Sequence, residues 1–316
     1  MNTFGRIYRL TDFGDTHGPA MGGIIDGCPA GLEMDTGFIS KELRRRSPSS
    51  HPHSTRRSED DTVIFLSGIN ENLTTGGPIG FIVENKKPQE RSDYADIMKP
   101  SHASYTYKMK YGARSNEDCG RASARQTVNR VVAGAVAKLI LKKYGITIEA
   151  FTTDTMQIPE GDTLGAKVAC TIKNLPAGLG EPVYDKFHAR LGYAMLSINA
   201  AKGFEIGEGF RAARMTGSEF NDRQREDFTF TSNHDGGVQG GITNGQDLFF
   251  SVAFKPIPTI RQEQQTIDFC GRPVSYTGNL RNDLCVAPRV IPVVEAMAAM
   301  TVVDFLLISK TIAHEI

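Results

Sequence analysis

The sequence predicts an α+β fold in a single domain spanning residues 1–316, and three observations support this prediction. Apolar residues recur at helical spacing in two long stretches, whereas shorter apolar runs bounded by glycine and proline indicate strands. These strands do not alternate regularly with helices, as they would in a doubly wound parallel sheet. No internal repeat, heptad pattern or long polar linker divides the chain.

Composition narrows the possible functions. The 316 residues are 40% hydrophobic, which is enough for a well-buried core. Lysine plus arginine equals aspartate plus glutamate at 36 each, so a local cluster of charges would have to bind any anion, and no nucleic-acid partner is expected. Five cysteines form no CxxC pair, and the N-terminal residues lack the apolar core of a signal peptide, so we expect a cytoplasmic protein.

The N-terminal part carries a first candidate residue. Residues 5–31 alternate short apolar runs with glycines, which predicts hairpin strands. The turn at 13–18 places His17 beside a glycine, so its ring could face a ligand, although exposed turn histidines without such a role are more common.

A basic region follows. Residues 38–46 predict a short helix, and the proline-broken segment at 44–57 is either a flap over an anionic substrate or a solvated loop. His51 and His53 within it have no third ligand at a recognisable spacing, so we predict no metal site. Strands are expected at 63–66 and 79–83. His102 follows a proline turn and either lines the same pocket as His17 or is structural.

A helix is predicted from Gly120 to about Gly145, because apolar residues recur at helical spacing and lysines precede a closing glycine. Its first turn carries Arg121 and Arg125, four residues apart, where the helix dipole favours carboxylates instead. Two guanidiniums and free backbone N–H groups would form a cradle for phosphate or another anion. Alternatively, both arginines pair with acidic side chains elsewhere, and the pattern favours neither interpretation.

The C-terminal half mixes both element types. Strands are predicted at 147–153, 166–172 and 248–254, and residues 195–207 form either a helix or a strand-to-turn segment. Two glycine pairs within 232–245 would let backbone lie against a flat group, or would form tight hairpin turns.

A long apolar helix is expected to start near Pro288. Glu295 and Asp304 interrupt its apolar run, and each would be costly at the centre of a bilayer. We therefore expect a buried helix and no association with a membrane.

Motifs narrow the function further. The chain lacks the GxxxxGK[ST] loop, the GxGxxG turn and the GxSxG elbow of nucleotide hydrolases, Rossmann enzymes and serine hydrolases. Several ordered motifs instead resemble those of the chorismate synthase family along nearly the whole chain. They are FGDTHG at 13–18 (similar to FGESHG), PSH at 100–102, GRASAR at 120–125, the segments 195–207 and 232–245, KP at 255–256, and RNDLCV at 281–286 (similar to RHDPCV).

This resemblance implies antiparallel β-sheets that sandwich a helical core. It also implies a lyase that converts 5-enolpyruvylshikimate 3-phosphate to chorismate and phosphate by 1,4-anti elimination, requiring reduced FMN without net redox change. The family assembles as homotetramers, so the same assembly is expected here. Because no nicotinamide fingerprint is present, an external flavin reductase or other reductant is expected to supply the reduced flavin.

The resemblance also implies roles for individual residues. His17 would protonate the departing phosphate, His102 would hold the reduced flavin in the right protonation state, and Asp283 would help flavin N5 accept the substrate C6 proton. Substrate contacts would fall on Arg46, Arg125 and Arg281. Flavin contacts would fall on Arg121, Ala122, Ser123, Asn199, Ala200, Gly240, Lys255, Pro256, Ile257, Pro258, Thr259 and Arg281.

The sequence departs from the family pattern in several places. The segment between Phe151 and Gly165 is much shorter, and residues unusual for the family stand at Glu117, Asp118, Cys119 and Asn282. Acids near a phosphate site raise an alternative, an inactive paralogue that binds flavin or a phosphorylated ligand; a third hypothesis is a phosphate-binding structural protein. The retained histidines, Arg125 and Asp283 favour an active enzyme.

Overall fold

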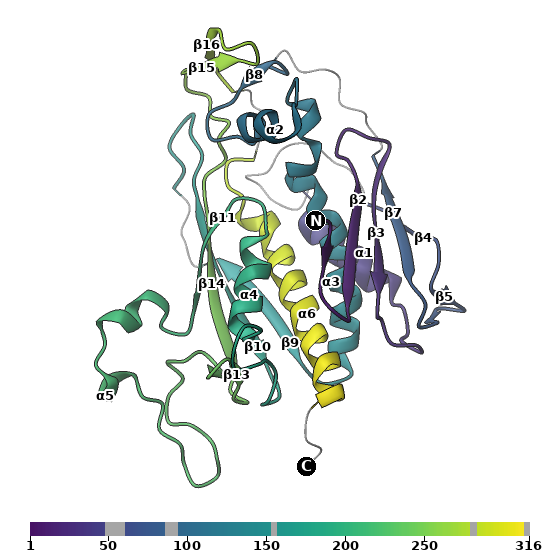
Figure 1. Ribbon diagram of the computed structural model, residues 1–316, viewed down its shortest axis with the longest axis vertical. Coiled ribbons are helices and arrows are strands. Elements are labelled where there is room, and N and C mark those ends of the chain that lie inside the picture. The colour runs from purple at the N-terminus through teal and green to yellow at the C-terminus, as the bar shows by residue number, and fades with distance from the viewer. Residues whose placement is uncertain (48–60, 86–93, 153–156, 279–282, 313–316) are drawn as a thin grey trace.

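Two antiparallel β-sheets lie on either side of a layer of helices (Figure 1). The computed structural model describes residues 1–47, 61–85, 94–152, 157–278 and 283–312. The five-stranded sheet has the order β1 (Thr3–Phe4), β2 (Arg9–Gly14), β3 (Ala20–Asp26), β7 (Ile79–Glu84), β4 (Val63–Phe65). The four-stranded sheet has the order β11 (Ala201–Ile206), β14 (Leu248–Phe254), β10 (Ala166–Lys173), β9 (Thr147–Thr152). The predicted α+β class and the sandwich of helices between sheets are confirmed.

Smaller sheets occupy the ends of the molecule. A three-stranded sheet joins β16 (Pro273–Tyr276), β15 (Gln264–Asp268) and β8 (Ile97–Met98). Two hairpins pair β12 (Val238–Gln239) with β13 (Ile242–Thr243) and β5 (Ile69–Asn70) with β6 (Leu73–Thr74). The glycine pairs of 232–245 thus belong to a hairpin and its flanking turn, the second of the two alternatives.

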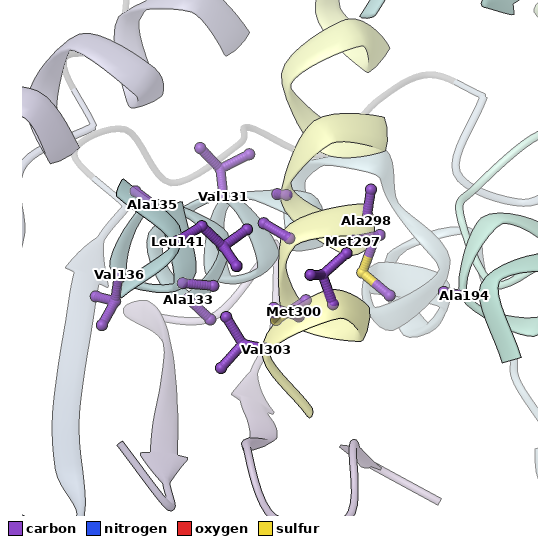
Figure 2. Packing of buried hydrophobic residues seen from close by; sticks show 14 of the residues in the cluster. Val131, Ala133, Ala135, Val136, Leu141, Ala194, Met297, Ala298, Met300 and Val303 are labelled. Atoms are coloured by element: carbon purple, nitrogen blue, oxygen red, sulfur yellow. The ribbon is translucent and has the colours of Figure 1, made fainter. Parts of the chain in front are cut away.

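The central layer contains α1 (Thr36–Arg46), α3 (Thr127–Lys142), α4 (Phe187–Leu196) and α6 (Ala287–Ile312). Helices α3 and α6 pack closely through small and branched side chains (Figure 2). Gly134 makes this approach possible, because a Cβ at that position would lie 2.2 Å from the Cβ of Ala296. The remaining helical segments are α2 (Ser104–Tyr111), α5 (Gly217–Phe220) and the 3-10 turns η2 (Glu117–Ala122), η3 (Ala124–Gln126) and η4 (Gly209–Arg214).

Helix α6 is long and apolar enough to cross a membrane, but 83% of its most apolar window is buried inside the protein. The two acidic side chains of α6 both have hydrogen-bond or ion-pair partners inside the protein. Asp304 accepts backbone N–H groups from Arg6, Ile7 and Tyr8 at 2.9, 2.7 and 3.0 Å, and Glu295 pairs with Arg45 and Lys138. The prediction of a buried helix is confirmed.

The predicted helix from Gly120 begins later than expected. Regular α-helix starts at Thr127, and two 3-10 turns precede it, separated by Ser123 in an extended conformation with ψ of 141°. Arg121 and Arg125 therefore do not share one helical face, and that part of the prediction is wrong. The spacing of apolar residues predicted the helix from Thr127 onward correctly. The helix start differs because Ser123 ends η2 and caps η3 by accepting the N–H of Arg125 at 3.3 Å.

Other predicted elements agree with the structure. The helix at 38–46 is α1, and the strands at 63–66, 79–83, 147–153, 166–172 and 248–254 are β4, β7, β9, β10 and β14. Residues 195–207 contain the end of α4, a turn and the strand β11. The basic segment 44–57 begins inside α1, and from residue 48 onward, including His51 and His53, it lies outside the described residues.

Candidate active site

The His17 turn lies between β2 and β3 and is docked against the start of η2–α3. Asn85 Nδ2 donates to the carbonyl oxygens of Asp15, Thr16 and Gly18 at 3.1, 3.3 and 2.7 Å. Thr16 Oγ1 donates to the carbonyl of Gly120 at 2.9 Å. A side chain at Gly120 would collide with the Asp15 carboxylate, so glycine leaves room for this carboxylate against η2. The result is a fixed turn that presents an exposed His17.

His102 lies in the turn between β8 and α2, close to two lysines. Burial first, and then the charges of Lys99 and Lys255, lower its pKa to about 4. Its Nδ1 accepts the backbone N–H of Ser104 at 3.2 Å, so the neutral ring carries its proton on Nε2. At neutral pH His102 is therefore a hydrogen-bond donor without charge.

Lys255 connects two backbone positions with unusual conformations. Ser101 and Ala200 have φ of 55° and 68°, in the left-handed region that residues with a Cβ rarely adopt. Lys255 Nζ donates to the Ser101 carbonyl at 2.6 Å, and its backbone N–H donates to the Ala200 carbonyl at 2.9 Å. One residue thus holds both strained turns, and it joins the His102 turn to the end of α4.

Residues expected to contact flavin continue from this point. Asn199 Nδ2 donates to the Ala122 carbonyl at 2.7 Å, which joins the α4–β11 turn to η2. Arg121 Nη1 donates to Asp12 Oδ1 at 2.9 Å and to the Gly14 carbonyl at 2.8 Å. Hydrogen bonds thus link the His17 turn, η2, the α4–β11 turn and the His102 turn, so their predicted site residues come together. The cationic side chains of Arg121 and Lys255 and the neutral imidazole of His102 form a donor set that suits an anionic planar cofactor.

Some predicted contacts lie elsewhere. Gly241, next to Gly240, accepts the N–H of Phe187 at the start of α4, whereas Asn199 follows its other end. A ten-residue helix is about 15 Å long, so Gly240 is not brought to the Asn199 group within this chain. Figure 1 shows β13 and α2 toward opposite ends of the molecule. Arg281 lies outside the described residues, as does Asn282.

Residues 255–259 lead from the other residues predicted to contact flavin toward Asp283. The carbonyl of Ile257 accepts the hydroxyl of Thr163 at 2.7 Å. Thr259 and Asp283 line one small crevice together with neighbouring residues of the 161–163 turn. The segment therefore leads from Lys255 to the carboxylate predicted to handle the proton.

Arg46 and Arg125 share one carboxylate. Asp61 Oδ2 accepts Arg46 Nη2 at 2.6 Å, and Asp61 Oδ1 accepts Arg125 Nη1. The Arg46 side chain is 2% exposed, and its Nε is buried without a hydrogen-bond partner among the described residues. For Arg121 and Arg125 the alternative of acidic partners, Asp12 and Asp61, is thus observed. That pairing does not exclude an anion, because Asp61 serves two guanidiniums at once.

Asp283 pairs with a residue that sequence reasoning overlooked. Its Oδ2 accepts Arg289 Nη1 at 2.6 Å, and Arg289 Nε donates to the backbone carbonyl of Arg46 at 3.2 Å. Arg289 lies in the first turn of the apolar helix, where a cation is unusual, and that position was the available signal. Asp61 was overlooked too, although it ends an acidic run directly after the basic segment.

The unusual residues before Gly120 have local roles. Asp118 Oδ2 accepts the backbone N–H groups of Arg114 and Ser115 at 2.6 and 3.1 Å, which fixes the turn into η2. Cys119 is buried, and burial raises the pKa of its thiol to about 11. The Asp118 carboxylate thus serves the turn. A separate cavity of about 670 Å³ is lined by residues of α1, β9 and α6, among them Lys41, Arg44 and Phe151, but by no predicted site residue.

Comparisons with known proteins agree with this arrangement. The family described as Chorismate synthase matches residues 8–160 and 154–307. A chorismate synthase of Parabacteroides distasonis is 49% identical over 355 aligned positions, covering 98% of this chain and 99% of the relative. The alignment is longer than the 316-residue chain, so the relative carries residues that have no counterpart here. The two family segments meet at 154–160, within the segment that the sequence indicates is shortened.

Further relatives give the same result. A chorismate synthase of Phocaeicola vulgatus is 47% identical over 98% of this chain and 99% of its own length. A crystal structure of a chorismate synthase superposes with a TM-score of 0.74 at 28% identity, covering 97% of this chain and 93% of the other. These matches establish that the chain belongs to the chorismate synthase family.

Proposed function

We propose that the chain converts 5-enolpyruvylshikimate 3-phosphate to chorismate and phosphate with reduced FMN as cofactor. The ring loses a proton from C6 and its phosphate, and a new double bond forms without net oxidation. Reduced FMN, when bound, supplies transient electron density for cleavage of the C–O bond. The residues of this chain would bind the phosphate, hold the cofactor and move the protons.

The observation that carries this proposal is the buried guanidinium of Arg46. An unpaired buried donor costs about 1–3 kcal/mol, and more when it is charged. Burial lowers the pKa of Arg46, and the neighbouring Arg289 and Arg125 lower it further against the opposing effect of Asp61. A phosphate oxygen would satisfy Nε and offset this repulsion, so the pair Arg46–Arg125 suits an anionic leaving group.

The two histidines would have different roles, one as a proton donor and the other as a neutral hydrogen-bond donor. His17, exposed on its fixed turn, would donate a proton to the leaving phosphate. His102 would donate a neutral hydrogen bond from Nε2 beside Lys99 and Lys255, whose charges favour an anionic cofactor. Asp283 would receive the proton that leaves the substrate ring. The residues predicted for flavin would hold the cofactor between η2, the α4–β11 turn and 255–259.

The test is anaerobic incubation of the purified chain with reduced FMN and 5-enolpyruvylshikimate 3-phosphate, followed by chorismate absorbance. We expect turnover with reduced FMN and none with oxidised FMN. His17→Ala and His102→Ala should each lower turnover by about 10²- to 10⁴-fold, the usual contribution of a positioned acid or base. Failure to form chorismate while FMN still binds would favour the inactive paralogue, which no observation on the structure favours at present.

We also propose a cytoplasmic homotetramer that receives reduced flavin from a separate reductant. The exposed Phe151 and Phe249 on the outer face of the four-stranded sheet provide apolar surface for such an assembly. Light scattering that shows a monomer at micromolar concentration would contradict the assembly. Reduction of FMN by NADPH with this chain as sole catalyst would contradict the external reductant.

A further inference from the structure

We propose that Arg289 is a positioning residue that aims the Asp283 carboxylate and ties it to the phosphate-binding arginines. This inference rests on the proposed function, in which Asp283 receives the substrate proton. The motifs that resemble the family end at Val286 and do not include Arg289. The geometry alone places it between the two groups.

The position of Arg289 in α6 is the first argument. It is the third residue of the helix, where the helix dipole disfavours a cation by a few tenths of a kcal/mol or more. A nearby anion offsets this cost. Asp283 provides it, with an Nη1 to Oδ2 distance of 2.6 Å, and both side chains are largely buried at 20% and 14% exposure. Such a pair has little freedom to move, because the Nε edge of the same guanidinium is held by the Arg46 carbonyl while Nη1 holds the carboxylate.

The second bond of Arg289 points to the phosphate side. Its Nε donates at 3.2 Å to the carbonyl of Arg46, the last residue of α1, where the negative end of that helix favours a cation. The guanidinium of the same Arg46 holds Asp61, which also holds Arg125. Arg289 therefore fixes the backbone that carries one phosphate-binding arginine and the side chain that receives the proton.

This connection has a mechanistic consequence. Elimination requires the leaving phosphate and the departing proton to be held in register across one small ring, and a misplacement of about 1 Å can cost 10²-fold in rate. Arg289 sets the distance between the two groups through the Asp283 carboxylate and the Arg46 backbone, and we assign it no direct contact with the substrate. Its loss should therefore slow the chemical step more than it weakens substrate binding.

The experiment compares Arg289→Ala, Arg289→Lys, Asp283→Asn and the double variant Arg289→Ala/Asp283→Asn in the anaerobic assay. Arg289→Ala should lower kcat by about 10- to 10²-fold, while KM changes by less than about threefold. Arg289→Lys and added guanidinium ion should each restore part of kcat, because they return a cation to the site. The double variant should be no slower than Asp283→Asn alone, because Arg289 acts through Asp283.

A matched control is Arg9→Ala, which removes an arginine from the exposed pair with Asp26 and should leave kcat within about twofold. Unchanged kcat in Arg289→Ala, a loss confined to KM, or additive losses in the double variant would each overturn the inference. If Arg289→Ala does not fold, the kcat of the folded Arg289→Lys variant decides, since a positioning role requires a partial loss. A normal rate in Asp283→Asn would instead refute the role of Asp283 in the proposed function.

Discussion

Two neighbouring arginines at the end of α1 enter two different charge clusters. Arg45 Nη1 donates to Glu42 at 3.0 Å and to Glu295 at 2.6 Å, and Lys138 contacts the same two carboxylates. These four residues form a balanced network of two cations and two anions. Arg46 instead shares the single carboxylate of Asp61 with Arg125 and keeps a buried Nε without a partner among the described residues.

The electrostatics of the two arginines differ accordingly. Glu295, through its hydrogen bond, raises the pKa of Arg45 against the effect of burial. Burial lowers the pKa of Arg46, and two nearby guanidiniums act in the same direction. Buried charge that is fully paired holds elements together, here α1, α3, α6 and, through the N–H of Ala150 to Glu295 at 3.0 Å, β9. A buried charged donor without an acceptor among the described residues, here Arg46 Nε, indicates a place for an anionic ligand.

The largest expected effect comes from breaking the balanced network. Glu295→Ala should lower the free energy of unfolding by about 3–5 kcal/mol, because it removes a buried carboxylate that Lys138, the partly exposed Arg45 and the Ala150 N–H all share. Urea unfolding followed by circular dichroism measures this loss. Glu208→Ala, which removes the acid of the exposed pair with Arg211, should change stability by less than about 1 kcal/mol. A similar small change in Glu295→Ala would show that the network is not what holds these helices.

Breaking the Arg46–Asp61–Arg125 cluster should affect function instead. Arg125→Ala should lower kcat/KM by about 10²- to 10³-fold, because a charged donor to the phosphate is lost. Arg125→Lys should recover only part of this, since a single ammonium cannot replace the guanidinium fork. The unfolding free energy should fall less than in Glu295→Ala. Unchanged substrate affinity in Arg125→Ala would remove the phosphate-binding interpretation of this cluster.

The difference between Arg45 and Arg46 also shows where sequence reasoning stops. Periodicity predicts α1 and most strands, because side-chain spacing reflects local geometry. It cannot tell which acids three consecutive arginines pair with. Arg45 pairs with Glu295, 250 residues away, and Arg46 pairs with Asp61, 15 residues away. Motif resemblance supplied the candidate residues. The pairing of Arg289 with Asp283, and the separation of Gly240 from the other residues predicted to contact flavin, depend on tertiary packing that no motif contains.

The pH dependence of stability at His102 is a smaller expected effect. It extends the comparison to a third site, where two lysines lie near an imidazole that stays neutral. Its pKa of about 4 lies below the ordinary value of 6.5, because of burial first and of Lys99 and Lys255 second. The unfolded chain therefore binds a proton at His102 between pH 6.5 and 4 that the folded chain does not. The contribution of His102 to the free energy of unfolding is therefore fully present above pH 6.5, and it falls as the pH is lowered toward 4.

Comparison with His102→Asn isolates this contribution, because the other titrating groups are common to both proteins. The wild type should lose about 1–2 kcal/mol more than the variant in unfolding free energy between pH 7.5 and pH 5, after allowance for partial solvent screening. Urea unfolding at the two pH values measures the difference. Equal losses in both proteins would mean that His102 takes up its proton in the folded state as readily as in the unfolded chain. The site would then tolerate a charged imidazole beside two lysines, and the role of His102 as a neutral donor to the cofactor would have to be abandoned.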